Sequence, residues 1–157
     1  MRLKEKYFPV DESAPAPLVA SCMRRVRFEE VDGLGMVWHG RYPSYLEDGR
    51  IAFGDAFGLT YQSFMVHNTV APIVKMHLDY RSVLRFDEQI TVETKLHWSD
   101  AARLNFTYTL FKKNGEVAAS GYTVQMMTEP DGTVLLVLPD WLETFRRKWK
   151  EGGFEKK

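Results

Sequence analysis

The strongest constraint on the fold comes from the second half of the chain, where apolar and polar residues alternate. The alternation covers four consecutive segments, 69–81, 89–98, 104–112 and 116–128. A period of two puts every second side chain on the same face of a strand, so each segment predicts a strand with one buried face. The last two are joined through Asn114-Gly115, the strongest short signal for a β-hairpin. The sequence therefore predicts an antiparallel sheet.

Helical spacing is present in two places. The segment 43–57 has an apolar stripe, and Pro43 suits its first helical turn. The stripe consists of Leu46, Phe53 and Phe57. Gly49 and Gly54 weaken an isolated helix, so we expect this helix to pack closely on the sheet. After Pro139, apolar residues recur every four positions and predict a short C-terminal helix. They are Trp141, Phe145 and Trp149.

These elements place the chain in the α+β class. A first strand is expected over 19–28 and a further one over 133–138, without the βαβ alternation of a parallel sheet. Residues 1–17 contain three prolines after position 8 and are expected to form an extended lead-in. One domain is expected over 18–150, followed by a flexible tail over 151–157.

Composition excludes several classes of protein. The chain has 21 Lys+Arg and 21 Asp+Glu, so its formal net charge of 0 argues against a nucleic-acid partner. A single cysteine, Cys22, cannot form a disulfide framework or a CxxC pair. The sequence has neither an 18-residue apolar run nor a signal-peptide core, so we expect a cytoplasmic protein without a membrane span.

The segment 29–43, between the first strand and the long helix, is rich in glycine and titratable residues. Loops between rigid elements are favoured sites of catalysis. Neither GxGxxG nor GxxxxGK[ST] is present, so this is not a phosphate-binding loop.

A pattern in this segment resembles the acyl-CoA thioesterases of the hotdog fold, in the 4-hydroxybenzoyl-CoA thioesterase group and its YbgC-like branch. The pattern is Asp32-x-x-Gly35-x-Val37-x-His39-x-x-Tyr42, followed by Tyr45, Glu47 and Arg50. The resemblance extends in weaker form over about residues 20–140. It departs at Val83, where many relatives have proline, which concerns only a strand edge.

The resemblance implies an antiparallel sheet wrapped around one long central helix. It also implies a homodimer or homotetramer joined through sheet edges, with active sites at the subunit interface. The acid at the position of Asp32 would be the catalytic nucleophile or general base, and a helix-terminal amide at the position of His39 would polarise the thioester carbonyl. The implied substrate is an acyl-CoA, with acyl carrier protein as another carrier. No metal or cofactor is implied, because coenzyme A belongs to the substrate.

The residues themselves fit this chemistry. A thioester has a good leaving group, so one carboxylate and one oxyanion donor can be sufficient. We therefore predict Asp32 and His39 as catalytic residues, the imidazole being able to carry either charge state near neutral pH. The predicted substrate-binding residues are Val37, Trp38, Gly40, Tyr42 and Glu47.

Structural roles stay open for the same side chains. An aspartate in a glycine-rich loop commonly stabilises a turn, and Trp38 and Tyr42 could belong to the core. Glu47 and Arg50, spaced i, i+3, could form a surface or inter-subunit ion pair. Two other functions also stay open, a hotdog hydratase or dehydratase and a noncatalytic acyl-CoA-binding module. The sequence does not identify the acyl group.

Overall fold

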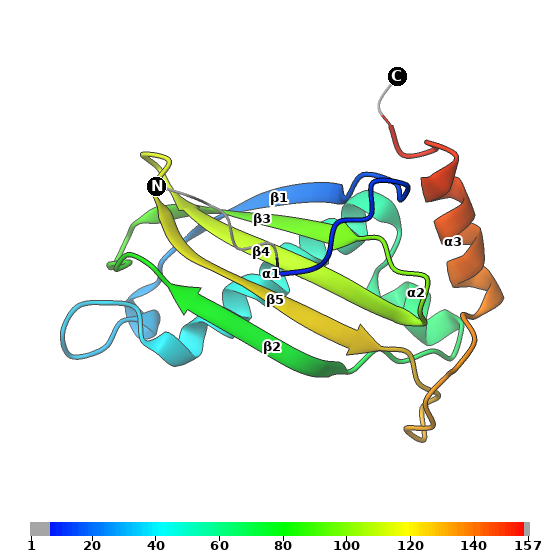
Figure 1. Ribbon diagram of the computed structural model, residues 1–157. Coiled ribbons are helices and arrows are strands. Elements are labelled where there is room, and N and C mark those ends of the chain that lie inside the picture. The colour runs from blue at the N-terminus through cyan, green and yellow to red at the C-terminus, as the bar shows by residue number, and fades with distance from the viewer. Residues whose placement is uncertain (1–6, 156–157) are drawn as a thin grey trace.

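The computed structural model describes residues 7–155 and contains a five-stranded antiparallel sheet with the order β1-β3-β4-β5-β2 (Figure 1). The strands are β1 (Leu18–Arg25), β2 (Ile73–Tyr80), β3 (Gln89–His97), β4 (Arg103–Lys112) and β5 (Val117–Met126). The helices are α1 (Tyr42–Phe57), α2 (Tyr61–Val66) and α3 (Asp140–Lys150). Two short 3₁₀ turns, η1 (Phe28–Glu30) and η2 (His39–Arg41), flank the glycine-rich loop.

The predicted sheet and both predicted helices are confirmed. Buried and half-buried residues alternate along β3 without interruption, and the turn between β4 and β5 has Gly115 at φ +86°. The boundaries differ at two strands. β1 ends at Arg25 because η1 begins three residues later. β2 begins only at Ile73, and its register with β5 shifts between Ile73 and Lys75, so Val74 has no partner residue in β5 and the predicted alternation is interrupted there.

Two parts of the sequence prediction are wrong. Residues 133–138 make only an isolated bridge, Val134 to Thr128. A ladder extending from this bridge would next have to pair with Met126. Met126 is already bonded to Pro72 on one side and paired with Arg103 on the other, so no further strand can form there. The short helix α2 was not predicted, since its six residues are too few to show a helical period.

Helix α1 lies along one face of the sheet and packs on β1 and β3 (Figure 1). Tyr45 and Phe53, on the side of this helix that faces the sheet, are fully buried. Gly49 faces the middle of β3, where a Cβ atom would lie 2.7 Å from Val92 Cγ1 and even closer to Thr94 Oγ1. The expectation that the helix α1 packs closely on the sheet at a glycine is therefore confirmed at Gly49.

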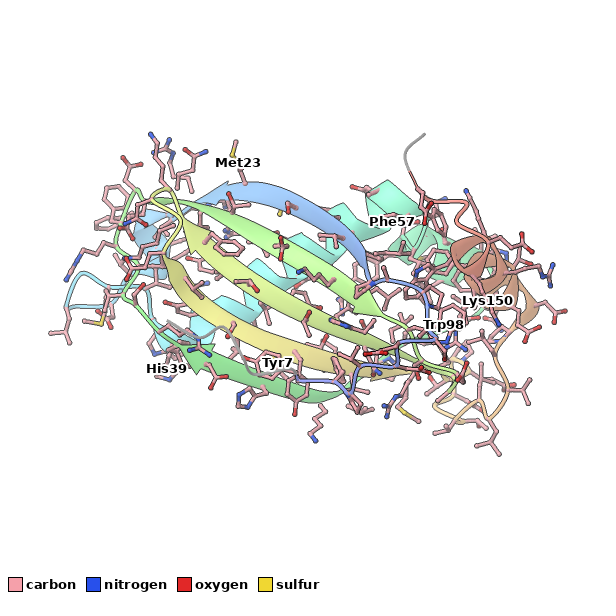
Figure 2. All side chains as sticks on the ribbon, turned by 45° about the horizontal axis from the view of Figure 1, so that its top comes forward. Tyr7, Met23, His39, Phe57, Trp98 and Lys150 are labelled. Atoms are coloured by element: carbon pink, nitrogen blue, oxygen red, sulfur yellow. The ribbon has the colours of Figure 1, made fainter. Side chains whose placement is uncertain are left out.

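The lead-in crosses the opposite face of the sheet. Residues 7–17 form no helix or strand, and Figure 2 shows Tyr7 over β5 and β2. Its hydroxyl lies 2.7 Å from Asp79 Oδ2 and 2.8 Å from Ser120 Oγ. Residues 1–6 of the predicted lead-in, and 156–157 of the predicted tail, lie outside the described residues.

Helix α3 covers one end of the sheet with the predicted aromatic stripe. Trp149 packs against Trp98 at 5.1 Å between ring centroids, and its indole N–H donates to Ala16 O over 2.9 Å. Beyond α3, Phe154 packs against Phe145. No helix within residues 7–155 is long and apolar enough to cross a bilayer.

The close contact at Gly49 gives a stability prediction. Gly49→Ala should lower the free energy of unfolding by about 1–3 kcal/mol, because overpacking against β3 outweighs the better helix propensity of alanine. Urea unfolding followed by tryptophan fluorescence measures this change. Gly33→Ala is the control, since a Cβ there meets no atom within 4 Å. An unchanged or higher stability of Gly49→Ala would show that α1 sits farther from the sheet than described.

Candidate active site

The glycine-rich loop closes on itself as a small hairpin. Val31 and Val37 form an antiparallel bridge, and Asp32 N donates to Met36 O over 2.8 Å. Gly35 adopts φ +78°, a left-handed conformation that favours glycine, and its amide donates to Asp32 O over 3.0 Å. The loop thus holds Asp32 at the start of a tight turn.

The Asp32 carboxylate combines a structural role with an open oxygen. Its Oδ1 accepts hydrogen bonds from Leu34 N at 2.8 Å and Met36 N at 3.4 Å, so the turn role considered from the sequence is present. Its Oδ2 receives no hydrogen bond from any residue between 7 and 155. The side chain is half-exposed. One oxygen therefore orients the carboxylate, and the other is available to a reactant.

The base of this loop is paired with the segment that follows β2. Val37 N donates to Leu84 O over 2.8 Å, Met36 forms a bridge with Arg85, and Trp38 N donates to Glu30 O over 2.9 Å. Leu84 is completely buried. The sequence analysis did not connect the segment at 84–85 with this loop, since no periodic pattern marks a pairing of two single residues.

His39 begins a helical segment that runs through η2 into α1. The first bond of this segment is donated by Arg41 N to Trp38 O over 2.9 Å, so the amides of His39 and Gly40 precede it. Such amides lack intrahelical acceptors and lie at the positive end of the helix dipole. These two amides follow the Asp32 loop in the chain, at the end of the helical segment where negative charge is favoured.

The side chain of His39 is exposed at the end of the molecule where β2 ends (Figure 2). Its ring packs against Trp38 with 5.1 Å between centroids. The Tyr80 hydroxyl donates to His39 O over 2.9 Å and thereby attaches the start of the helical segment to the last residue of β2. Tyr80 is a further residue of this region, for which no role at the site was predicted from the sequence.

The predicted substrate-binding residues fall into two groups. Val37 and Tyr42 are only 6% and 4% exposed and belong to the core of the protomer. Burial raises the pKa of Tyr42 to about 12, with Tyr80 and Glu88 adding to the effect. Trp38, Gly40 and Glu47 are exposed.

Two of these exposed positions have distinct surroundings. A Cβ atom on Gly40 would collide with the indole ring of Trp38, so a larger residue there would require that ring to move. Glu47 forms no ion pair with Arg50 or with any other residue in the described part of the chain. Arg50 instead contacts the hydroxyl of Tyr61, with its guanidinium carbon 5.4 Å from the ring centroid.

An ion network around the buried Glu30 joins the base of the Asp32 loop to β1 and α1. Glu30 is 2% exposed, and its Oε2 lies 2.6 Å from Arg24 Nη2 on β1, while its Oε1 accepts from Arg27 N over 2.7 Å. Arg24 also forms an ion pair with Asp48 on α1 and lies 4.7 Å from the ring centroid of Tyr45. No role at the site was predicted from the sequence for Arg24, Glu30 or Asp48, because an alternating strand that ends in two arginines does not indicate which guanidinium reaches a buried carboxylate.

An apolar cavity of about 830 Å³ lies between α1, α2 and the start of β2. Phe53, Leu59, Phe64, Ala71 and Phe106 are among its apolar lining residues, and Arg50, Tyr61 and Gln125 supply polar groups. The Asp32 loop and α2 lie at opposite ends of β2 (Figure 1). Within one protomer, therefore, the cavity is remote from the carboxylate.

The structure shows no cluster of three or more His, Cys, Asp or Glu side chains that could hold a metal ion within residues 7–155. His77 and His97 lie on the face of the sheet away from α1, and each ring nitrogen Nε2 lies within hydrogen-bond distance of one side chain. His77 Nε2 is 2.9 Å from Asp79 Oδ2, and His97 Nε2 is 2.7 Å from Thr107 Oγ1.

The ion network gives a second prediction. Arg24→Met should lower the free energy of unfolding by about 3–5 kcal/mol, because it leaves the buried Glu30 carboxylate without its counter-charge. Arg25→Met is the matched control, because Arg25 pairs with Asp87 at the surface, where such pairs contribute about 0–1 kcal/mol. Equal effects of the two substitutions in urea unfolding would show that the Glu30 pair does not fix the loop.

Comparison with known proteins identifies the family of this chain. The model of the Thioesterase-like superfamily matches residues 26–145. YneP of Bacillus subtilis is 22% identical over 129 residues, which are 80% of this chain and 94% of YneP. The acyl-CoA thioesterase YbgC of Haemophilus influenzae is 28% identical over 89 residues, 56% of this chain and 65% of YbgC.

Similarity extends to solved structures. The DHNA-CoA thioesterase from Staphylococcus aureus has a TM-score of 0.76 and 21% identity, covering 88% of this chain and 96% of that one. The hypothetical protein TT1821 from Thermus thermophilus has a TM-score of 0.75 and 26% identity, covering 84% of this chain and 98% of that one. The family identified from the loop pattern is confirmed: the chain belongs to the Thioesterase-like superfamily and has the hotdog fold.

Proposed function

We propose that the protein hydrolyses an acyl-CoA thioester to a free carboxylic acid and coenzyme A. The observation that carries this proposal is the open Oδ2 of Asp32, in a loop that continues into the unpaired amides of His39 and Gly40. A carboxylate beside an oxyanion donor is sufficient for an ester with a thiolate leaving group. Membership of the thioesterase superfamily and the similarity to YbgC support the same reaction.

In this reaction the thioester oxygen points at the helix-terminal amides. Asp32 either removes a proton from water, which attacks the carbonyl carbon, or attacks that carbon itself to give a mixed anhydride that water then hydrolyses. Either attack places negative charge on the oxygen, where the amide dipoles stabilise it. Collapse breaks the carbon–sulfur bond, and the thiolate leaves as coenzyme A and gains a proton. No cofactor is needed, because coenzyme A enters with the substrate.

The other predicted residues have supporting roles in this proposal. His39 contributes its backbone amide, and its exposed imidazole is a second proton carrier beside the reacting group. Trp38, Gly40 and Glu47 are open to the substrate, whereas Val37 and Tyr42 support the loop from the core.

The proposed enzyme is at least a homodimer, with each active site built from two protomers. Strand β2 is a free edge of the sheet, and an exposed edge is a template for pairing with another strand. A two-fold axis through β2 exchanges its ends, so it brings the Asp32 loop of one protomer to the apolar cavity of the other. In this dimer the cavity holds the acyl group of the substrate. A thioester of acyl carrier protein is the alternative substrate to an acyl-CoA.

The Asp32 carboxylate is tested by Asp32→Asn. Thiol release from short-chain, long-chain and aromatic acyl-CoAs, and from an acyl carrier protein thioester, should fall by about a hundredfold or more, equivalent to ~2.7 kcal/mol of transition-state stabilisation. Asp131→Asn is the matched control, because Asp131 Oδ1 also accepts a hydrogen bond from a backbone amide two residues on, at 2.8 Å, in a distant turn.

Two results would contradict the proposal. One is full activity of a folded Asp32→Asn variant, and the other is the absence of turnover with every thioester in the panel. In the second case, calorimetric titration with coenzyme A would decide whether the protein is a noncatalytic binding module.

A further inference from the structure

Tyr80, the last residue of β2, contacts the start of the helical segment, 41 residues away in the sequence. Its hydroxyl donates to His39 O over 2.9 Å. This oxygen belongs to the same peptide unit as Gly40 N, one of the two amides at which the proposed reaction directs the thioester oxygen. A peptide unit is planar and trans, so its C=O and its N–H point in opposite directions. The hydrogen bond that holds the His39 carbonyl therefore also fixes the direction of the Gly40 N–H.

We propose that Tyr80 is a positioning residue for thioester hydrolysis, because it orients the peptide unit whose N–H at Gly40 stabilises the negative oxygen. This inference rests on the proposed function and deepens it by giving a task to a side chain at the end of β2. The tyrosine acts through the peptide and does not itself touch the reacting atoms.

The proline at the start of α1 explains why a side chain is needed at this carbonyl. In an α-helix, the carbonyl of residue 39 would accept a hydrogen bond from the amide of residue 43. That residue is Pro43, which has no N–H. The backbone of Arg41 and Tyr42 is already helical, with φ −88° and −60°, so the donor is missing from an otherwise helical turn. The Tyr80 hydroxyl supplies a donor in its place.

The Gly40 N–H is available to a substrate. Within residues 7–155 this amide donates no backbone hydrogen bond, because the first bond of the segment is donated by Arg41 N. Gly40 is also exposed. A peptide whose carbonyl already accepts a hydrogen bond is polarised, which makes its N–H a stronger donor. The contact from Tyr80 thus sets the direction of this amide and strengthens it.

Tyr80 is held firmly enough to position another group. Its ring packs edge-on against Tyr42, with 4.8 Å between centroids and an interplanar angle of 87°, and Tyr42 belongs to the buried core. Its backbone pairs with Ala119 on β5, and the next residue, Arg81, donates its amide to Ala118 O over 2.9 Å. Groups supported by a sheet are placed more precisely than groups on loops. The sheet therefore fixes the tyrosine, and the tyrosine fixes the peptide.

A role in the fold alone would give a different result on mutation. The Tyr80 side chain is 52% exposed, so water can replace its hydrogen bond and the loss of the hydroxyl should hardly change stability. The loss of an oriented oxyanion donor should instead appear in the catalytic rate, because the negative charge on the oxygen is present only in the transition state.

Tyr80→Phe tests the role of the hydroxyl while keeping the ring against Tyr42. With the acyl-CoA that the wild type turns over fastest, kcat should fall by about tenfold and KM should stay the same. Tyr7→Phe is the matched control, because the Tyr7 hydroxyl contacts Asp79, the preceding residue of β2, on the other face of the sheet. This control should keep the kcat of the wild type. Urea unfolding of both variants checks that they are folded.

A second substitution should rescue the first. Pro43→Ala restores an N–H four residues after His39, where a helical turn places the donor for its carbonyl. Adding Pro43→Ala to Tyr80→Phe should therefore recover most of the lost kcat. The cycle completed by Pro43→Ala alone measures the coupling between the two positions.

Nuclear magnetic resonance of the Gly40 amide tests the orientation without reference to activity. In protein labelled selectively at glycine, Tyr80→Phe should shift the Gly40 amide resonance, because the carbonyl of its peptide unit loses a donor. Gly115, in the turn between β4 and β5, should not shift, and Tyr7→Phe should leave both resonances in place.

The outcomes separate this inference from the proposed reaction. An unshifted Gly40 resonance, a wild-type kcat in Tyr80→Phe, an equal loss in Tyr7→Phe, or no recovery with Pro43→Ala overturns the role of Tyr80. A shifted Gly40 resonance in a protein that hydrolyses no thioester supports the hold of Tyr80 on the peptide and contradicts the proposed function.

Discussion

The buried ion pair between Glu30 and Arg24 is the interaction on which the arrangement of this site depends. A charge buried to this degree needs a partner, and Arg24 supplies one from β1 while also reaching Asp48 on α1. The carbonyl of Glu30 in turn holds the amide of Trp38. A single guanidinium therefore links the sheet, the base of the Asp32 loop and the long helix, and it fixes where the carboxylate lies relative to the helix-terminal amides.

The position of the apolar cavity follows from the way α1 crosses the sheet. Close contact at Gly49 seats the helix on β3, and the first turn is held to the end of β2 through Tyr80 and His39. This placement leaves the inner face of β2 uncovered and opens the apolar cavity near Ile73. The Asp32 loop and the apolar cavity thus lie at opposite ends of one free strand, which is why a second protomer is part of the proposed site.

Sequence periodicity predicted the strands and helices that bury one regular face. The glycines and titratable residues of segment 29–43 predicted the loop that carries Asp32. β3, β4, β5 and the Asn114-Gly115 hairpin were predicted closely, because the alternation, which is least regular in β5, and the turn residues point to the same strands. The strand at 133–138 was wrong, since its neighbouring edge was already paired, and α2 was too short to show a period. The ion network was missed because the burial of Glu30 beside Arg24 depends on tertiary contacts. The pairing at Leu84 was missed because it involves single residues, which show no period.

Subunit complementation tests the composite site most directly. Asp32→Asn lacks the carboxylate, and Ala71→Trp fills the cavity, so each homodimer should be inactive towards acyl-CoA. If each site takes its carboxylate from one protomer and its cavity from the other, random mixing should restore about a quarter of wild-type activity, because half of the dimers then hold one intact site. A mixture that exchanges subunits, shown by mass spectrometry of tagged chains, and stays inactive would contradict the account.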